Sequence, residues 1–472
     1  MSHFVARSPI PVSAATLFDW HERPGAFARL SPPWQDVSLE RFDGIQPGDR
    51  AVIRLGVGPA AIRWTAEHHG YSRACDEGDT ACEFRDTQIS GPFAAWEHVH
   101  RVIPRGPEAS ELEDDVTYTL PLAPVSTAVG GGIARGQLER MFGYRHRVTQ
   151  EDLARHAAWD GEPWTIAITG STGLIGSALC AFLGGGGHRI VRLVRSREDL
   201  RTWDRGENER AILWNPASGE IDLDGLAALA PQAVIHLAGE PVFGFPWSTA
   251  KKRRIWESRT RGTLLLSRAL AALPTPPEVF ISASASGIYG HTGSRPTTEA
   301  EPPGTGFLAE VCQAWEAATA DAEAAGIRTV HARIGLVLSP AGGMLATLGP
   351  LAQLGLAGWP GDGSAFWPWL ALDDALYAFH HLLRSSARGP VNLSAPTPAP
   401  SKVVVKALGR TLGRPTLGRM PAPILKTLGG EAAREIALKS VRMVPAALRA
   451  SGFRYAYPTL DAALGHLYGT AQ

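Results

Sequence analysis

The stretch WTIAITGSTGLIGSALCAFLGGGGHRIVRLVRS, residues 164–196, decides the fold of the larger part of the chain. A short apolar run at 166–168 leads into a turn with glycines at 170, 173 and 176. An apolar segment with helical spacing follows, four glycines end it, and a second β-rich run covers 190–194. Strand, glycine turn, helix and strand within about thirty residues is the layout of a dinucleotide-binding βαβ unit.

Each glycine of the turn has its own physical role. Gly170 permits a turn that a Cβ atom would block, Gly173 lets the backbone approach a pyrophosphate, and Gly176 lets the helix pack tightly. The N-terminus of the helix offers N–H groups and a positive dipole end to the phosphates. The triplet alone also fits an ordinary tight turn, so the flanking strands carry the prediction. The predicted cofactor-binding turn is Gly170, Ser171, Thr172, Gly173, Leu174, Ile175 and Gly176.

The end of the second strand indicates which cofactor binds. Units that bind NAD usually carry Asp or Glu there for the ribose 2′-hydroxyl, whereas this chain has Arg195 followed by Ser196. An arginine can pair with a 2′-phosphate, and no carboxylate is present to repel it. A solvated arginine at a strand end is the alternative. We expect NADP(H).

The composition narrows the class of protein. A chain of 472 residues is too long to form a single hydrophobic core, so two or three domains are expected. The apolar fraction of 44% and the charged fraction of 19% are typical of a globular protein. Equal numbers of basic and acidic residues, 46 each, give no argument for nucleic acid or an anionic membrane. The N-terminus lacks the pattern of a secretory signal, and no apolar run is long enough for a membrane span. We expect a cytoplasmic protein.

The four cysteines are scattered: Cys75, Cys82, Cys180 and Cys312. They form no CxxC pair and have no histidine cluster close by in the sequence. We therefore expect neither a disulfide framework nor a zinc site, which agrees with a reducing interior.

The first 155 residues differ from the rest in pattern. A strand at 4–10, a short helix capped by Ser13 and a turn near 23–30 are followed by six short alternating runs. A helical segment from about 133 to 156 closes the region, and the polar residues 150–163 read as a linker. One strand, short helices, antiparallel strands and a long last helix predict a sheet wrapped around a helix.

This order of elements resembles the START-like (SRPBCC, polyketide-cyclase-like) helix-grip fold. The strings RPGAFARLSPPW at 23–34, GPFAAWEHVHRV at 91–102 and DDVTYTLPL at 114–122 carry the resemblance. It implies an apolar cavity for a hydrophobic small molecule between helix and sheet. His98 and His100 share one strand face, but with no third donor nearby in the sequence we expect a structural role and no metal site. Trp34, Trp64 and Trp96 fit either a cavity lining or a core.

Beyond residue 196, strands and helices alternate. The runs 211–214, 233–239, 279–282 and 329–338 read as strands, which predicts a parallel, doubly wound sheet of the Rossmann type. Ligands of such sheets lie at the carboxyl ends of the strands. We therefore place Leu237, Ala238 and Gly239 beside the cofactor.

The strings TGSTGLIG, LAGEPV, SRTRGT, ISASASGIYG, GFLAEVCQAWE and ARIGLVLSPAGGML occur in this order and resemble the epimerase-like subfamily of extended short-chain dehydrogenase/reductases. The C-terminal string SVRMVPAALRASGFRYAYPTLDAAL resembles the small domain that ends its members. The resemblance implies a small-molecule substrate and places Arg333 near the nicotinamide. The expected domains are a START-like domain at 1–158, a Rossmann domain at 164–400 and a small helical domain at 414–467.

The expected proton relay of this class is missing. A Tyr-x-x-x-Lys helix and a strand serine carry the chemistry in these reductases. Ser284 matches the serine, but Cys312 and Glu316 stand where tyrosine and lysine belong, and the chain contains no other YxxxK. Tyr289 at the strand end or a buried Glu316 could move the proton, and Cys312 could donate weakly. Packing and surface roles for Cys312 and Glu316 are the alternative.

Three downstream features complete the reading. The glycine- and tryptophan-rich stretch 355–369 reads as a loop that gates the pocket. Ala371 replaces the histidine of a family string around Trp369, and Asp374 reads as a helix cap.

Two functions stay open: an NADP(H)-dependent oxidoreductase or epimerase in which Ser284, Tyr289 and Glu316 do the chemistry, or a non-catalytic NADP(H)-binding sensor or carrier that uses the START-like cavity. The oligomeric state is not predicted.

Overall fold

The computed structural model of the chain forms two compact units, built mainly from Met1–Glu162 and from Pro163–Leu183 with His188–Tyr468. Each unit is described by itself. The structure describes residues 1–56, 58, 61–76, 78, 80–121, 125–203, 208–244, 246–420 and 430–471. Within these ranges, no helix is both long enough and apolar enough to cross a membrane.

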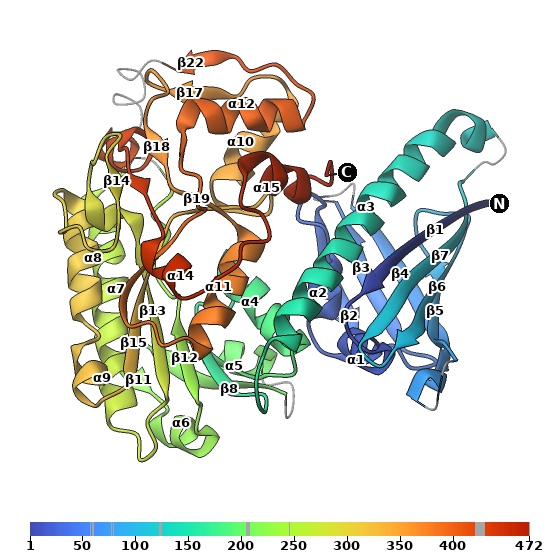
Figure 1. Cartoon of the computed structure of the whole chain (residues 1–472), viewed down its shortest axis with the longest axis horizontal. Helices are drawn as coiled ribbons and strands as arrows, with labels where there is room; N and C mark the ends of the chain where they lie inside the picture. Colours follow the sequence, from blue (N-terminus) through green and yellow to red (C-terminus); the bar gives the residue numbers. More distant parts are fainter. Residues whose placement is uncertain are drawn as a thin grey trace. The chain divides into compact units, whose positions relative to one another are not determined.

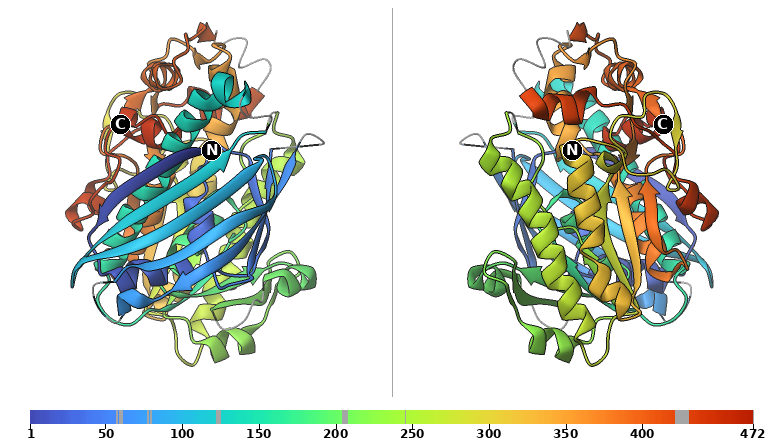
Figure 2. Two further views of the ribbon diagram at one scale, coloured as in Figure 1. Left: turned by 90° about the vertical axis from the view of Figure 1, so that its right-hand side faces the viewer. Right: turned by 90° about the vertical axis from the view of Figure 1, so that its left-hand side faces the viewer.

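The first unit is a seven-stranded antiparallel sheet with helices against one face, in the strand order β1-β7-β6-β5-β4-β3-β2 (Figures 1 and 2). Its strands are β1 (Ser2–Ile10), β2 (Val37–Phe42), β3 (Arg50–Leu55), β4 (Ile62–Ser72), β5 (Cys82–Ser90), β6 (Ala95–Gly106) and β7 (Ala109–Thr119). Its helices are α1 (Ala14–Glu22), α2 (Ala26–Leu30), the 3-10 turn η2 (Ala74–Asp76) and α3 (Val125–Ala157). The predicted helix-grip class is confirmed.

Local sequence explains how the first unit begins and ends. The Ser13 side chain accepts a hydrogen bond from the Thr16 N–H, which confirms the predicted cap of α1. Helix α3 extends to Ala157, so the prediction of a linker from residue 150 is wrong for its first eight residues. The polar pattern misled because Asp152 lies inside the unit, where both of its oxygens accept from the guanidinium of the equally buried Arg29 at 2.7 and 2.8 Å.

One disulfide joins Cys75 of η2 to Cys82 at the start of β5. The expectation of no disulfide is therefore wrong for this pair, because a spacing of seven residues has no sequence motif of its own. The turn through η2 brings the two Cα atoms to 5.0 Å, within the range that a disulfide spans. Cys180 and Cys312 are free thiols and both are buried.

The second unit contains an eight-stranded sheet in the order β11-β10-β9-β8-β12-β13-β15-β20. All neighbouring strands are parallel except β10 and β11, which confirms the predicted Rossmann class. The strands are β8 (Thr165–Thr169), β9 (Arg189–Val194), β10 (Glu209–Asn215), β11 (Glu220–Ile221), β12 (Ala233–His236), β13 (Val279–Ala285), β15 (Arg328–Ile334) and β20 (Gly389–Leu393). The chain reverses direction of winding between β8 and β12, which creates the crevice where such sheets bind ligands.

Helices cover both faces of this sheet, because its central strands are buried on both sides. Helices α7 and α8 lie side by side on one face (Figure 2, right), and α4 packs against α11 through Phe182 and Tyr377. The helices are α4 (Leu174–Gly185), α5 (Arg197–Trp203), α6 (Leu223–Leu229), α7 (Thr249–Ala271), α8 (Phe307–Ala317), α9 (Ala320–Ala324) and α11 (Leu372–Arg384).

Short elements after β13 and β15 form the rest of this unit. They are η3 (Ser286–Tyr289), β14 (Pro296–Thr297), β16 (Leu336–Leu338), α10 (Gly343–Gln353), β17 (Gly358–Pro360), β18 (Phe366–Trp367), β19 (Trp369–Ala371), β21 (Ala399–Pro400), α12 (Ser401–Thr411), β22 (Gly418–Met420), the π-helical turn η4 (Arg434–Leu438), β23 (Arg442–Met443), α14 (Ala446–Ala450) and α15 (Leu460–Leu467). The expected helical C-terminal part at 414–467 therefore also contains strands, and its residues 421–429 lie outside the described ranges.

Two sequence expectations for this region are wrong. The stretch 355–369 contains β17 and β18, which pair with β22 and β21. Asp374 is not a helix cap, because α11 begins after Ala371. Both Asp374 oxygens instead accept backbone N–H groups, from Ala456 at 2.7 Å and from Tyr457 at 3.1 Å. These distant partners tie the C-terminal segment to α11, and no local sequence pattern reports them.

Candidate active site

The glycine turn after β8 is shaped by close backbone contacts. Gly170 has φ of +67°, and a Cβ atom there would lie 2.8 Å from the Ala238 nitrogen. A Cβ atom on Gly176 would lie 2.1 Å from the Gly170 oxygen, so the start of α4 packs directly on the turn. Thr172 and Gly173 lie at the surface of the turn, while Ser171 is buried. The turn therefore presents backbone rather than side chains at the carboxyl end of the sheet.

A buried polar chain fixes the exit of β12 beside this turn. The Thr169 hydroxyl accepts the N–H groups of Leu237 at 3.1 Å and Ala238 at 3.2 Å and contacts Nδ1 of His236 at 2.7 Å. His236 Nε2 contacts the Thr263 hydroxyl, which in turn donates to the Arg259 carbonyl.

The direction of the hydrogen bonds in this chain follows from its last donor. Because the Thr263 hydroxyl donates to a carbonyl, it accepts from His236 Nε2, and His236 Nδ1 then accepts from Thr169. Burial lowers the pKa of His236 to about 3, in agreement with a neutral ring. Sequence reasoning missed this histidine, although its place at the end of an apolar strand was visible.

The end of β9 carries the two residues predicted to select the cofactor. Arg195 and Ser196 are both exposed, and the Ser196 hydroxyl accepts the Asp199 N–H at the start of α5. Arg192, three residues before Arg195, is buried and donates to the Ser171 carbonyl at 2.8 Å. The sequence analysis did not identify Arg192, whose hydrogen bond to Ser171 holds the glycine turn in place. A charged residue inside an apolar strand could have indicated this role.

Ser284, Tyr289 and Glu316 meet in one cluster around Arg333. The Ser284 hydroxyl at the end of β13 donates to Glu316 Oε1 at 2.6 Å. Arg333 on β15 donates to both Glu316 oxygens at 2.9 Å each and to the Tyr289 hydroxyl at 2.9 Å. Ser284 and Arg333 are direct neighbours in the parallel register of β13 and β15. The three residues predicted for chemistry are thus brought together by a residue predicted to border the cofactor.

The charges of the cluster are strongly interdependent. Burial disfavours the charge of Arg333, but the hydrogen bonds to Glu316 outweigh this effect and raise the pKa of the guanidinium. Burial raises the pKa of Tyr289, although the charge of Arg333 acts in the opposite direction. A planar guanidinium bound bidentately to a carboxylate is a rigid pair. The position of Glu316 is therefore fixed by an arginine from β15.

Two further residues complete the cluster and were not predicted. The Tyr289 hydroxyl donates to Asn392 Oδ1 at 2.6 Å, and the Asn392 amide nitrogen donates to the Val444 carbonyl. Glu299 accepts the backbone N–H groups of Asn392 and Ala447. These contacts join residues 52 to 148 positions apart in the chain, so only the fold reveals them.

Cys312 lies at the edge of the cluster, where its thiol meets Ser284. Its side chain is buried, and burial raises the pKa of the thiol to about 11. The thiol is therefore a poor proton donor or nucleophile at neutral pH. Beside Tyr289, a polar pocket opens; its lining includes His291, Thr292, Arg295, Thr305, Glu435 and Lys439.

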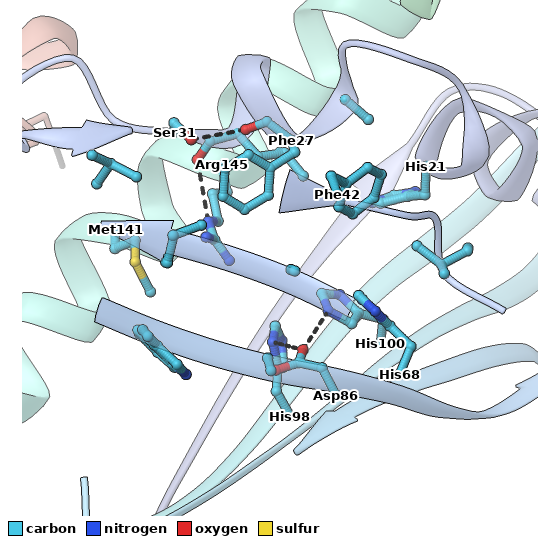
Figure 3. A pocket seen from close by; sticks show the side chains of 18 of the residues that line it. His21, Phe27, Ser31, Phe42, His68, Asp86, His98, His100, Met141 and Arg145 are labelled. Atoms are coloured by element: carbon cyan, nitrogen blue, oxygen red, sulfur yellow. Dashed lines mark hydrogen bonds and ion pairs between the residues drawn. The ribbon is translucent and has the colours of Figure 1, made fainter. Parts of the chain in front are cut away.

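The first unit holds a separate cavity of about 150 Å³ between its sheet and helices (Figure 3). An engineered cavity of this size in another protein binds benzene. Trp64 and Trp96 line the cavity, together with apolar side chains that include Phe27, Leu30, Phe42, Ile53, Phe84 and Met141. Charged and polar groups are also present on its wall: His21, His68, Asp86, His98, His100 and Arg145.

The sequence expectation that no third donor lies near His98 and His100 is wrong. Asp86 Oδ2 lies 3.2 Å from His98 Nδ1 and 3.5 Å from His100 Nε2, and Asp114 contacts both rings from the other side. Burial disfavours a charge on His98, but Asp114 and Asp86 outweigh burial and raise its pKa to about 9. By contrast, burial lowers the pKa of His21 to about 4.

The fold and the site define the second unit as an extended short-chain dehydrogenase/reductase. The model of the NAD dependent epimerase/dehydratase family matches residues 166–394. Residues 420–467 match a domain of unknown function, DUF1731, and residues 10–142 match the polyketide cyclase/dehydrase and lipid transport family. An epimerase family protein of Mycobacterium bovis is 39% identical over 302 residues, which are 64% of this chain and 96% of that protein. The chain belongs to this epimerase family, fused to an N-terminal SRPBCC domain.

Two solved structures are similar. One is titled a nucleoside-diphosphate sugar epimerase from Corynebacterium glutamicum, with 32% identity and a TM-score of 0.77, over 99% of this chain and 91% of that one. The other is the human epimerase family protein SDR39U1 with NADPH, with 26% identity and a TM-score of 0.57, over 65% of this chain and all of that one. The first similarity extends through both units.

Proposed function

We propose that the chain is an NADP(H)-dependent oxidoreductase or nucleotide-sugar-epimerase-like enzyme. The observation that carries this proposal is the cluster in which Arg333 joins Glu316 and Tyr289, with Ser284 bound to Glu316. The charged, hydrogen-bonded cluster lies at the carboxyl ends of β13 and β15, the edge at which sheets of this kind bind their ligands. By the resemblance, Glu316 stands where the usual lysine is expected and Cys312 where the tyrosine is expected.

The residues at the predicted cofactor site fit a phosphorylated dinucleotide. A Cβ atom would fill the cradle at Gly170, and the turn offers backbone close to the N-terminus of α4. Gly173 and Gly176 complete the cradle, and Leu237, Ala238 and Gly239 border the crevice. The exposed guanidinium of Arg195, with Ser196 beside it, would bind the 2′-phosphate. When bound, the nicotinamide would accept or supply a hydride.

The chain's own residues would move the proton. The Ser284 hydroxyl donates to Glu316, so its lone pairs can receive a proton from a substrate hydroxyl while its own proton passes to the carboxylate. In the reverse direction, Glu316 returns the proton through Ser284. Arg333 would hold Glu316 in line, and Tyr289, whose hydroxyl donates to Asn392, would border the substrate. Return of the hydride to the same molecule is epimerisation; its net transfer is reduction.

Isotope transfer tests the enzymatic proposal. NADPH deuterated at the nicotinamide C4 is incubated with the full-length protein and a panel of nucleotide sugars and carbonyl compounds. We expect deuterium in one class of product, and loss of transfer in Ser284→Ala. The matched control is Ser282→Ala, which removes a buried hydroxyl two residues earlier on β13. Transfer that persists in Ser284→Ala would contradict the relay.

A second candidate function is a non-catalytic NADP(H)-binding sensor or carrier. The absence of a YxxxK pair and the high pKa of Cys312 favour it. In this case the domain at 1–158 would bind an apolar ligand in its cavity, and the nucleotide would bind at 164–400 without reaction. Tight NADPH binding with full retention of deuterium across the panel would support this reading.

A further inference from the structure

Three ligand atoms converge on one point in the wall of the N-terminal cavity. Asp86 Oδ2 faces His98 Nδ1 at 3.2 Å and His100 Nε2 at 3.5 Å, and each of the three residues offers a ligand atom within 4.8 Å of the other two (Figure 3). Both distances exceed the roughly 2.7–2.9 Å of a charge-assisted hydrogen bond. Two ligands that are each about 2.0–2.1 Å from a tetrahedral metal ion stand about 3.3 Å apart. The two spacings of 3.2 and 3.5 Å therefore bracket the separation that metal coordination requires.

A second carboxylate orients both rings from behind. Asp114 Oδ1 contacts His98 Nε2 at 3.0 Å and His100 Nδ1 at 2.7 Å. The other Asp114 oxygen contacts His146 Nε2 at 2.7 Å. Histidines that bind metals usually donate their second ring nitrogen to such a carboxylate, which fixes the tautomer. A bound metal ion would displace the proton that His98 shares with Asp86, and with the remaining N–H groups directed at Asp114 the lone pairs of His98 Nδ1 and His100 Nε2 would face the ion.

The charge and the rigidity of the site also agree with a divalent ion. Asp86 and Asp114 are largely buried, and one dication offsets their two negative charges. All three ligands stand on paired strands, because Asp86 of β5 is the register partner of His98 of β6 and His100 follows two residues later on the same face. The second cluster of metal-binding residue types in the described residues is Cys75, Asp76 and Cys82. Its two cysteines form the disulfide and are therefore not available as metal ligands.

We propose that Asp86, His98 and His100 bind one divalent first-row transition-metal ion such as Zn²⁺, with an open coordination position toward the cavity. Three protein ligands and an open fourth position are typical of reactive metal sites. All three ligands line the cavity, whose other walls are mainly apolar. The occupant is therefore an apolar molecule with an oxygen donor that completes the coordination sphere. The inference is independent of the nucleotide site.

Metal titration of the full-length protein tests the proposal. After removal of metals with a chelator, Zn²⁺ is titrated by calorimetry and Co²⁺ by its visible absorption. We expect one ion per chain and a Co²⁺ spectrum typical of four-coordinate geometry. His98→Ala and the near-isosteric Asp86→Asn should each weaken binding by more than about 100-fold, and Asp114→Asn by about 10- to 100-fold because it only orients the ligands.

The control is His68→Gln, which changes a histidine in the same cavity that is not one of the three ligands. It should leave the metal affinity unchanged, and circular dichroism with thermal unfolding reports whether each variant is folded. Binding that is weaker than millimolar in the unmodified protein overturns the proposal. So does binding that persists in both His98→Ala and Asp86→Asn, or that falls equally in His68→Gln.

Discussion

Arg333 and Glu316 form a bidentate ion pair in which Nε and Nη2 of the arginine each lie 2.9 Å from a different carboxylate oxygen. The pair links β15 to α8, and Glu316 also accepts the hydroxyl of Ser284. Because a guanidinium presents its donors in a fixed fork, the pair sets both the place and the orientation of Glu316. The candidate relay therefore depends on an interaction between a strand and a helix rather than on a motif within one helix.

Removal of the carboxylate should leave the Arg333 charge buried without its main partner. We expect Glu316→Gln to lower the free energy of unfolding by about 3 kcal/mol, in the range for breaking a buried ion pair, and to abolish isotope transfer. Glu310→Gln, at an exposed position on the same helix, is the control and should change stability by less than about 0.5 kcal/mol. Denaturant unfolding followed by circular dichroism measures both, and equal stability of the two variants would contradict the pairing.

Two glycine substitutions separate the cost of an unfavourable backbone conformation from the cost of a steric clash. Gly170→Ala places a Cβ atom against backbone atoms of Leu237 and Ala238 at 2.8–3.0 Å, at a φ of +67°. Gly219→Ala has a similar φ of +75°, but its Cβ atom meets nothing within 4 Å. We expect a loss of about 1 kcal/mol at Gly219 from backbone conformation alone, and a larger loss at Gly170 together with loss of NADPH binding. Calorimetric titration with NADPH checks the second point; unchanged affinity in Gly170→Ala would contradict the assigned cofactor turn.

The sequence predicts the parts of the site that are local and not the parts that depend on strand neighbours. The βαβ unit can be predicted because its glycine spacing, strand pattern and helix pattern lie within one short stretch of sequence. The roles of Arg333 and Asn392 are not legible, because each meets Tyr289 only after β13, β15 and β20 are placed side by side. The third donor beside His98 was missed for the same reason: Asp86 is twelve residues away in sequence but directly opposite in the strand register.

The state of the four cysteines can be tested by counting the thiols that react with a labelling reagent. Of the four cysteines, Cys75 and Cys82 form a disulfide, and burial raises the pKa of the Cys180 thiol to about 12 and that of Cys312 to about 11. We expect no rapidly labelled thiol in the native protein at about pH 8, because thiolate is the reactive form. Labelling with a chromogenic disulfide reagent should give two thiols after unfolding and four after unfolding with reduction. One fast native thiol would mean that Cys312 or Cys180 is accessible.

Reversal of charge at Arg195 tests cofactor selection. If its guanidinium binds the 2′-phosphate, Arg195→Glu should weaken NADPH by about 10- to 100-fold, the size expected for a hydrogen bond between charged groups, and should leave NADH nearly unchanged. Arg201→Glu makes the same change at an exposed position on α5 and should affect neither cofactor. Fluorescence titration with both cofactors gives the ratio. Equal weakening of NADPH and NADH would refute the assignment.

The neutral His236 at the exit of β12 should make stability depend on pH in a defined direction. Its pKa falls from 6.5 to about 3 in the folded protein because burial disfavours the charge, so the unfolded chain binds an extra proton between these values. The contribution of the neutral His236 to the free energy of unfolding is complete above about pH 6.5 and is lost as the pH falls. One proton corresponds to about 1.4 kcal/mol per pH unit. In His236→Asn this loss is absent, so the stability advantage of the unmodified protein over the variant should shrink by about 1.5 kcal/mol between pH 6.5 and pH 5. Denaturant unfolding at several pH values measures the difference, and parallel pH profiles for the two proteins would show that His236 is charged in the folded state.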